Sequence, residues 1–253
     1  MLLENKVAIV TAGAGRGIGS SIVRRFAAEG AAVAIVDFDL EGATALADEI
    51  KAGGGQAIAV QADVAEQDDV LRAVSETVAA FGTVSILINH AGIGRADLIE
   101  RMTYEQWRRI CAVNLDGTFF FTQAVIPYMK ENNWGRIVST ASRAAYRASR
   151  GAYARGMAAY AATKLGIVGF SRAAAFELGP YQITVNVIAP GLTSPDNGVN
   201  LGDPSLEGEG QVLPLRFVEP DEIAAAAMYL VGPGSDRTTG QVLHVNSGSY
   251  FNA

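Results

Sequence analysis

The sequence predicts an α/β fold, in which helices cover both faces of a parallel β-sheet. Short apolar runs alternate with longer stretches of helical periodicity from one end of the chain to the other. The apolar runs are continuous and rich in Val and Ile, which is typical of strands that are buried on both faces. No break in composition divides the chain, so we expect a single domain over residues 1–253.

Each expected element follows from its local pattern. In the first helix, Ile22, Val23 and Phe26 share one side, and Gly30 marks the end. About seven strands are expected, at 6–11, 32–37, 56–61, 85–89, 136–140, 183–189 and 241–245. The helices are expected at 19–30, 41–52, 67–81, 104–130, 158–179 and 220–231. Residues 191–215 are rich in Gly, Pro and acidic residues, and a loop of this length inside a compact domain is typical of a substrate lid or of a disordered segment; we expect a substrate lid.

The composition argues against several classes of protein. A formal net charge of -6 does not suit a surface that binds nucleic-acid phosphates. Cys111 is the one cysteine, so no disulfide is expected, which suits the reducing cytoplasm. Only His90 and His244 join it as strong metal ligands, so no metal site is expected. The start has no signal-peptide pattern, and no apolar stretch approaches the ~20 residues that span a bilayer, so no membrane contact is expected.

The segment TAGAGRGIG (11–19) lies between the first expected strand and the first expected helix. Its glycines Gly13, Gly17 and Gly19 have the spacing G-x-x-x-G-x-G. Glycines at such a turn let backbone N–H groups approach a pyrophosphate, which the positive end of the helix then stabilises. The position of this loop predicts a dinucleotide-binding site on a doubly wound sheet of the Rossmann type.

Asp37 closes the second expected strand, 18 residues after Gly19. A carboxylate there can accept hydrogen bonds from the adenosine ribose hydroxyls and repel a 2′-phosphate, which favours NAD over NADP. Arg16, inside the loop, could instead attract that phosphate, so NADP is the alternative. Asp63 could accept a hydrogen bond from the adenine amino group, and NHAG (89–92) could approach the adenosine ribose. Both also fit ordinary turn chemistry at a strand end.

The segment YAATK (160–164) places Tyr160 and Lys164 one turn apart on the same helix face. A free tyrosine titrates near pH ~10, which is too high for a base at neutrality. A neighbouring ammonium stabilises the phenolate and lowers the tyrosine pKa toward the working pH. No other tyrosine in the sequence has a lysine at this spacing, so the pair is a candidate for proton transfer.

Taken in order, VAIVTAGAGRGIG, NHAG, YAATK, APG and TGQVLHVNSG resemble the compact form of the short-chain dehydrogenase/reductase family over nearly the whole chain. The resemblance implies an oxidoreductase that interconverts a secondary alcohol and a ketone with NAD(H). It implies that Tyr160 is the general acid/base and that Lys164 lowers its pKa and binds the nicotinamide ribose. Ser142, or less favourably Ser139, would hold the reacting oxygen, and Asn114 would hold a water that relays protons to Lys164. The implied cofactor contacts are Gly13, Arg16, Gly17, Ile18, Gly19, Asp37, Asp63, Val64, Asn89, Ala91, Gly92, Tyr160, Lys164, Pro190, Gly191 and Thr193.

Three positions depart from the family pattern. Ala12 stands where a Thr usually precedes the first loop glycine, with Thr11 one place earlier. His90 replaces the second Asn of the N-N-A-G motif, where we expect a strand-end turn residue rather than a catalyst. Pro195 stands where a Thr often bonds the cofactor carboxamide, so Thr193 is the substitute candidate.

The segment 143–159 carries four arginines and no acidic residue, which suggests a site for an anionic substrate such as a carboxylate, phosphate or sulfonate. Two alternatives are pairing with the acidic residues of the 191–215 loop and a solvated subunit edge. The arginines are Arg143, Arg147, Arg150 and Arg155, and the acids are Asp196, Asp203, Glu207 and Glu209. The apolar tail SYFNA fits burial against another subunit. The resemblance implies a homotetramer, with the long helices 104–130 and 158–179 at one interface.

Other functions remain open on the sequence. The first is an NADP(H)-dependent reductase of carbonyl or 3-oxoacyl substrates, which Arg16 supports. A dinucleotide sensor without catalysis would predict that Ser142, Tyr160 or Lys164 is lost, and all three are present. An isomerase or dehydratase usually carries a longer C-terminal substrate domain than this chain has room for.

Overall fold

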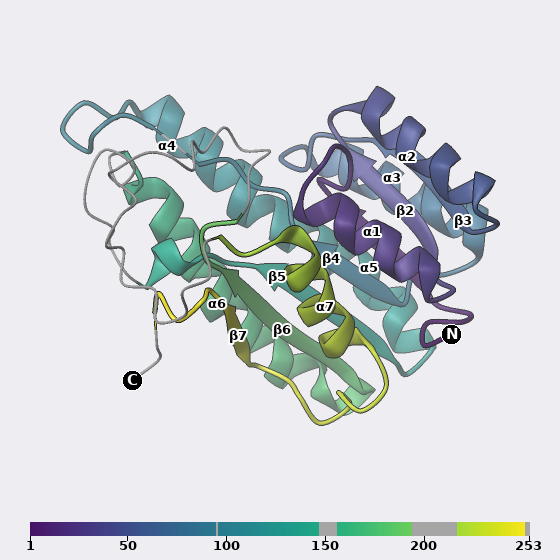
Figure 1. Cartoon of the computed structure of the whole chain (residues 1–253). Coiled ribbons are helices and arrows are strands. Elements are labelled where there is room, and N and C mark those ends of the chain that lie inside the picture. The colour runs from purple at the N-terminus through teal and green to yellow at the C-terminus, as the bar shows by residue number, and fades with distance from the viewer. Residues whose placement is uncertain (95, 147–155, 194–216, 251–253) are drawn as a thin grey trace.

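The computed structural model describes residues 1–94, 96–146, 156–193 and 217–250, which form one parallel sheet of seven strands flanked by helices (Figure 1). The strand order is β3-β2-β1-β4-β5-β6-β7, and every pairing is parallel. The predicted Rossmann-type, doubly wound fold is therefore confirmed. The strands are β1 (Val7–Thr11), β2 (Ala32–Asp37), β3 (Gln56–Gln61), β4 (Ile86–Asn89), β5 (Gly135–Thr140), β6 (Ile183–Pro190) and β7 (Val242–Val245).

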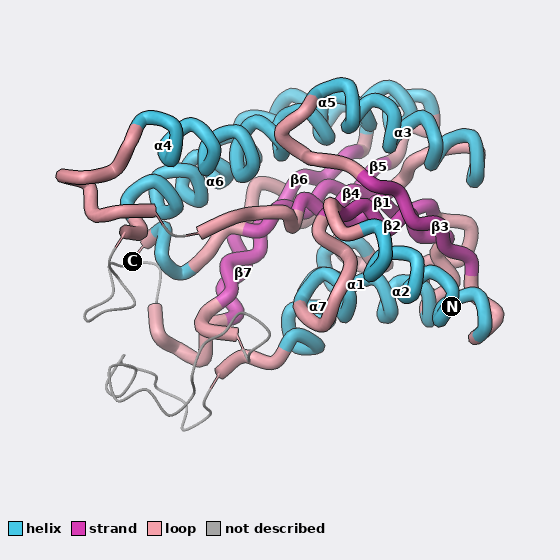
Figure 2. The backbone as a smooth tube through the Cα atoms, turned by 90° about the horizontal axis from the view of Figure 1, so that it is seen from above, coloured by secondary structure: helices cyan, strands magenta, loops and turns pink. Residues whose placement is uncertain are grey.

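Helices form a layer on each side of the sheet, as Figure 2 shows edge-on. One layer contains α1 (Ile18–Ala28), α2 (Leu40–Ala52) and α7 (Pro220–Val231). The other contains α3 (Gln67–Phe81), α5 (Gly117–Glu131) and α6 (Ala158–Leu178), with α4 (Tyr104–Cys111) beyond the sheet edge. These bounds agree with the expected helices to within a few residues, apart from the stretch 104–130.

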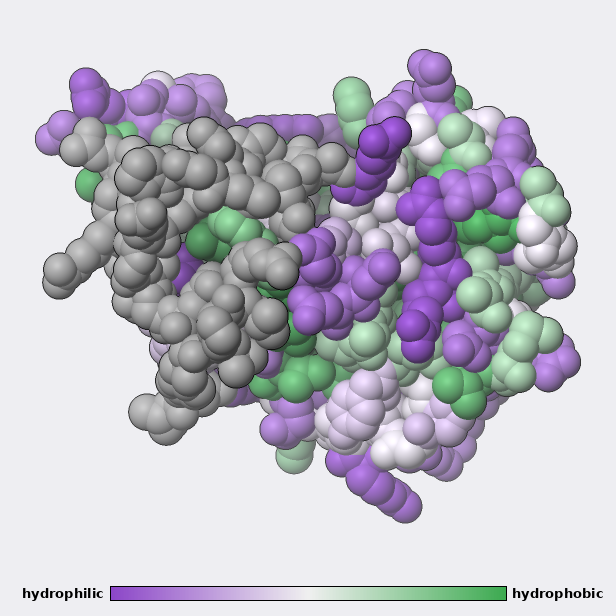
Figure 3. Space-filling view, viewed as in Figure 1, coloured by the Kyte–Doolittle hydropathy of each residue, from purple (hydrophilic) through white to green (hydrophobic). Residues whose placement is uncertain are grey.

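The apolar core is divided by the sheet, because successive residues of a strand point to opposite faces. Within β1, Ala8 and Val10 pack with the α1, α2 and α7 layer, whereas Ile9 packs with the α3, α5 and α6 layer. Both sets are fully buried, which explains why the strand sequences are continuous apolar runs. On the face shown in Figure 3, hydrophobic residues lie in separate groups among hydrophilic ones.

The stretch expected as one helix at 104–130 is three segments. A capping box joins Thr103 and Gln106 at the start of α4, and a π-helical segment, Ala112–Asp116, separates α4 from α5. A Cβ on Gly117 would come within 2.9 Å of the Val64 carbonyl oxygen, so a glycine permits the close approach of α5 to the end of β3.

The same stretch qualifies our expectation about membranes. By length and hydropathy, Tyr104–Glu131 is long and apolar enough to cross a bilayer, and 44% of its most apolar window is buried within the protein. The helix α5 packs on α3 and β4, so its apolar residues contribute to the core of the protein. A core helix can be as long and as apolar as a membrane-spanning one.

Candidate active site

The candidate residues gather at the edge of the sheet where the parallel strands end. Asp37 ends β2, Asn89 ends β4 and Pro190 ends β6. The strand order reverses between β1 and β4, and in open α/β sheets the crevice outside the carboxyl ends at such a reversal binds ligands. The topology therefore brings together groups that are far apart in the sequence.

The glycine-rich loop begins with a residue in a strained backbone conformation, and two of its three glycines have no space for a side chain. Ala12 has a φ of 53°, in the left-handed region that is unfavourable for a residue with a Cβ. A Cβ on Gly13 would lie 2.9 Å from the Ile35 side chain, and a Cβ on Gly19 would clash with the Ala12 carbonyl oxygen. These two glycines are needed for packing within the protein. Gly17 has open space around it and extended backbone geometry.

Thr11 takes a role that its displaced position obscured in the sequence. Its Oγ1 accepts hydrogen bonds from the backbone nitrogens of His90, at 2.9 Å, and Ala91, at 3.0 Å. It also donates to the carbonyl oxygen of Ile88, at 3.4 Å. The hydroxyl thereby fixes the NHAG segment against the end of β1.

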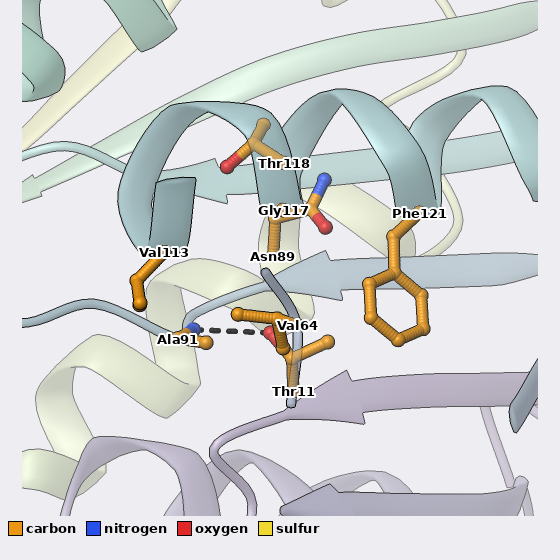
Figure 4. A pocket seen from close by; sticks show the side chains of 8 residues that line it. All are labelled: Thr11, Val64, Asn89, Ala91, Val113, Gly117, Thr118 and Phe121. Carbon is orange, nitrogen blue, oxygen red and sulfur yellow. Dashed lines mark hydrogen bonds between the residues drawn. The ribbon is translucent and has the colours of Figure 1, made fainter. Parts of the chain in front are cut away.

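A small hollow, too narrow to hold a water molecule, lies beside the ends of β1 and β4. Figure 4 shows side chains from β1, β4 and α5 pointing toward it, with the Ala91–Thr11 hydrogen bond at its edge. Three of the residues that line it, Val64, Asn89 and Ala91, are candidate cofactor contacts, so the hollow adjoins the candidate dinucleotide site. The lining residues are Thr11, Val64, Asn89, Ala91, Val113, Gly117, Thr118 and Phe121.

The two acidic candidates are already engaged with the protein. Asp37 accepts hydrogen bonds from the backbone nitrogens of Ala14, at 2.9 Å, and Asp39, at 3.0 Å. Asp63 accepts from the Ala65 nitrogen at 3.0 Å and from Nη2 of Arg109 at 2.9 Å. The two carboxylates are therefore fixed in place before a cofactor binds. The ion pair with Arg109 was not expected from the sequence, because 46 residues separate the partners.

Lys164 is almost completely buried, at 2% exposure, although lysine is normally a surface residue. It extends from α6 to the end of β5, where its Nζ donates to the Thr140 carbonyl oxygen at 2.7 Å. Burial lowers the pKa of its ammonium group to about 8. The Nζ lies 5.6 Å from the centre of the Tyr160 ring, so the spacing seen in the sequence does bring the two side chains together.

Asn114 lies in the π-helical segment and is completely buried. Its side chain accepts from the Ile93 nitrogen at 2.8 Å and donates to the Ile93 oxygen and to Thr163 Oγ1, both at 3.0 Å. A Cβ on Gly92 would lie 3.0 Å from Lys164 Nζ and 3.3 Å from Asn114 Oδ1, so the three residues adjoin. Single π-helical turns of this kind often occur at functional sites, where they reorient a residue.

The two serine candidates have different surroundings. Ser139 is 1% exposed, and its Oγ lies 3.4 Å from Nδ2 of Asn89, in the interior of the sheet. Ser142 lies beyond the end of β5, is half-buried, and accepts from the Ala144 nitrogen at 3.1 Å. Ser142 is therefore the serine whose hydroxyl can face a substrate.

The remaining candidates lie around this centre. The Gly191 nitrogen donates to the Val245 oxygen at 2.8 Å, so the Pro190–Gly191 turn is held by β7. Thr193 Oγ1 lies 3.4 Å from the Gly191 oxygen. Arg16 is exposed and Arg143 is buried at 5% exposure. Pro195 and the other three arginines of the 143–159 segment lie outside the described residues, as does the expected lid beyond residue 193. No cluster of metal-ligating side chains occurs among the described residues.

A glycine loop at a Rossmann switch point, together with a buried lysine beside a tyrosine, defines an oxidoreductase that uses a nicotinamide cofactor. Residues 6–204 match the family described as short chain dehydrogenase, and this chain belongs to that family. The compact fold, the Rossmann topology and the class of enzyme expected from the sequence are thereby confirmed.

Several relatives match the chain over nearly its full length. It is 40% identical to subunit BbsD of (2S)-[(R)-hydroxy(phenyl)methyl]succinyl-CoA dehydrogenase from Thauera aromatica, with 98% of each chain covered. It is 38% identical to the 3-oxoacyl-[acyl-carrier-protein] reductase FabG from Staphylococcus epidermidis, covering 98% of this chain and 100% of the relative. The structure of a Burkholderia cenocepacia short chain dehydrogenase in complex with NADP superposes with a TM-score of 0.89 at 35% identity, covering 98% and 99% of the two chains.

Proposed function

We propose that this protein transfers a hydride between NAD(H) and a secondary alcohol or ketone. The observation that carries the proposal is the buried Lys164 ammonium beside Tyr160, because a buried cation is the feature that makes a tyrosine useful as an acid or base near neutrality. Tyr160 would remove or return the hydroxyl proton. Ser142 would bind the same oxygen and hold the reacting carbon against the nicotinamide.

The chain's own residues support a proton path away from Tyr160. Lys164 would donate to the nicotinamide ribose while its Thr140 contact holds it in place. Asn114 adjoins Lys164 across Gly92, which suits the water-holding role that the family resemblance implies. Asn114 donates both of its amide hydrogens, to Ile93 and to Thr163. We therefore propose that a water would bind to Asn114 by donating a hydrogen bond to one of the oxygen atoms of this residue.

Asp37 supports NAD as the cofactor. Its carboxylate is held by Ala14 and Asp39 at the end of β2, and a fixed anion there disfavours a 2′-phosphate by repulsion and desolvation. Arg16 is exposed and lies in the loop, where it supports the second candidate, an NADP(H)-dependent reductase of 3-oxoacyl or other carbonyl substrates. The relative crystallised with NADP and the FabG relatives also favour this second candidate.

An anionic substrate remains part of the proposal. Arg143 follows Ser142 directly, is buried, and would place a guanidinium close to the reacting oxygen. The names of two relatives, a hydroxy(phenyl)methylsuccinyl-CoA dehydrogenase subunit and a 3-oxoacyl-[acyl-carrier-protein] reductase, are consistent with an oxygenated acyl thioester. The homotetramer also stays a prediction, supported by the exposed Phe119, Leu165 and Phe176 on α5 and α6, which are the helices assigned to an interface.

The proposal is tested by following nicotinamide absorbance with NAD(H) and NADP(H) against a panel of 3-hydroxyacyl thioesters, hydroxy acids and neutral secondary alcohols. We expect Tyr160→Phe to lower kcat by about a thousandfold or more while the Kd for NADH changes little. Tyr229→Phe, an exposed and distant tyrosine, is the matched control. Full activity of Tyr160→Phe would contradict the mechanism, and failure to bind either cofactor would contradict the proposed function.

A further inference from the structure

His90 follows the end of β4, where a turn residue was expected, and its side chain also makes a specific contact with β5. Its Nδ1 lies 3.1 Å from Oγ1 of Thr140. The backbone ladder between β4 and β5 ends one residue earlier, with the pairing of Asn89 and Ser139. The side chains of His90 and Thr140 therefore continue the connection between the two strands beyond the last backbone pairing.

Thr140 is the residue on which the candidate reacting groups depend. Its carbonyl oxygen accepts from Lys164 Nζ at 2.7 Å, and the chain reaches Ser142 two residues later. Thr140 is 7% exposed, so solvent does not compete strongly for its hydroxyl. A bond that fixes Thr140 thus acts on both the lysine and the serine.

The ionisation of His90 agrees with this position. Burial, with the positive charge of Lys164, lowers the pKa of His90 to about 4. The imidazole is therefore neutral at physiological pH and adds no charge beside the ammonium. A neutral imidazole can donate to or accept from the Thr140 hydroxyl, according to its tautomer.

We propose that His90, acting through the Thr140 side chain, is a positioning residue that holds the end of β5 so that Lys164 and Ser142 are correctly placed for hydride transfer. The inference rests on the proposed function for its catalytic consequence. Its structural part, the coupling of His90 to Lys164 through Thr140, does not depend on the substrate.

The test is a double-mutant cycle with His90→Phe and Thr140→Val. Both substitutions keep approximate size and remove the side-chain hydrogen bond, while Thr140→Val keeps the carbonyl that Lys164 uses. We expect each to lower kcat about fivefold, the value of one hydrogen bond, with the Kd for NADH within twofold. The double variant should be no slower than either single variant. His90→Asn should restore kcat to within twofold, because its amide occupies the place of the imidazole Nδ1.

A second readout does not require activity. In the protein without cofactor, the pKa of Lys164 can be followed by 13C NMR of labelled lysine. We expect His90→Phe and Thr140→Val each to lower it further, because a loosened Thr140 carbonyl stabilises the ammonium less well. Unchanged kcat and an unchanged lysine pKa in both variants, or strictly multiplicative effects on kcat, would overturn the proposal. If the wild type lacks hydride transfer while the lysine pKa shifts as expected, the proposed function fails and the coupling stands.

Discussion

The Asp37 carboxylate accepts a hydrogen bond from the backbone nitrogen of Ala14, 2.9 Å away, so the end of β2 is joined to the glycine-rich loop. The same carboxylate accepts from the Asp39 nitrogen, which begins the turn into α2. One side chain thus organises both segments that would surround the adenosine ribose, in addition to being the acceptor expected for its hydroxyls.

Asp37→Ala should therefore reverse the proposed preference for NAD over NADP. We expect the Kd for NADH to rise about tenfold, the value of a hydrogen bond to a charged group, while the Kd for NADPH falls because the repulsion is removed. Fluorescence titration with both cofactors measures the two constants. Asp48→Ala, an exposed acid on α2, should change neither. Parallel losses for NADH and NADPH would mean that Asp37 acts only on the loop.

The ion pair between Asp63 and Arg109 should influence recognition of the adenine ring. Arg109→Ala is expected to weaken NADH binding by about threefold, since a partly exposed pair contributes less than about 1 kcal/mol. Binding of nicotinamide hypoxanthine dinucleotide, which has a carbonyl in place of the amino group, should not change, because it cannot donate to Asp63. Arg108→Ala on the same helix is the control. Equal weakening for both dinucleotides would show that Arg109 does not act through Asp63.

The loop glycines should divide into two kinds. Gly19→Ala is expected to lower the free energy of unfolding by about 2 kcal/mol, because its Cβ would clash with the Ala12 carbonyl. Gly17→Ala should leave stability within about 0.5 kcal/mol, since its Cβ meets open space, and should still weaken cofactor binding where the backbone approaches the pyrophosphate. Urea unfolding and cofactor titration distinguish the two effects. Equal stability of the variants would contradict this division.

Burial of Lys164 should appear in the pH dependence of stability. Its pKa is lowered from 10.5 to about 8, so between these values the unfolded state binds more protons and stability rises with pH. Below pH 8 the cost of burying the charge is fully present, on the order of 3 kcal/mol. The difference in unfolding free energy between wild type and Lys164→Met should therefore change by about this amount from pH 7.5 to 10.5. A difference that is constant with pH would refute the shift.

Much of the fold could be predicted because its determinants are local. The continuous apolar runs of the parallel strands, and helix signals such as Gly30, gave element bounds that the structure matches closely. The break at Ala112–Asp116 could not be predicted, since no proline or glycine lies within it, and it follows from the packing of Asn114 and Gly117 against distant residues.

The site shows the same limit. The spacing of Tyr160 and Lys164 is a helical repeat and could be read from the sequence. The hydrogen-bond partners of the other residues could not be read in this way. Lys164 and His90 both contact Thr140, and Asp63 contacts Arg109. The fold brings these partners together, and their spacing in the sequence does not. The function of Thr11 had a signal, its shift by one place from the family position, although its hydrogen-bond partners His90 and Ala91 could not be deduced from that shift.

The place of β1 at the centre of the sheet has a consequence for synthesis. Ala8 pairs with Val33 on one side and with Ile86 on the other, so one edge of β1 has no partner until the chain is 86 residues long. During that interval its unpaired N–H and C=O groups are a template for association with other chains. We therefore expect fragments that end between residues 41 and 85 to aggregate. Nascent chains on ribosomes that stall in this interval should depend on chaperones more than longer nascent chains do.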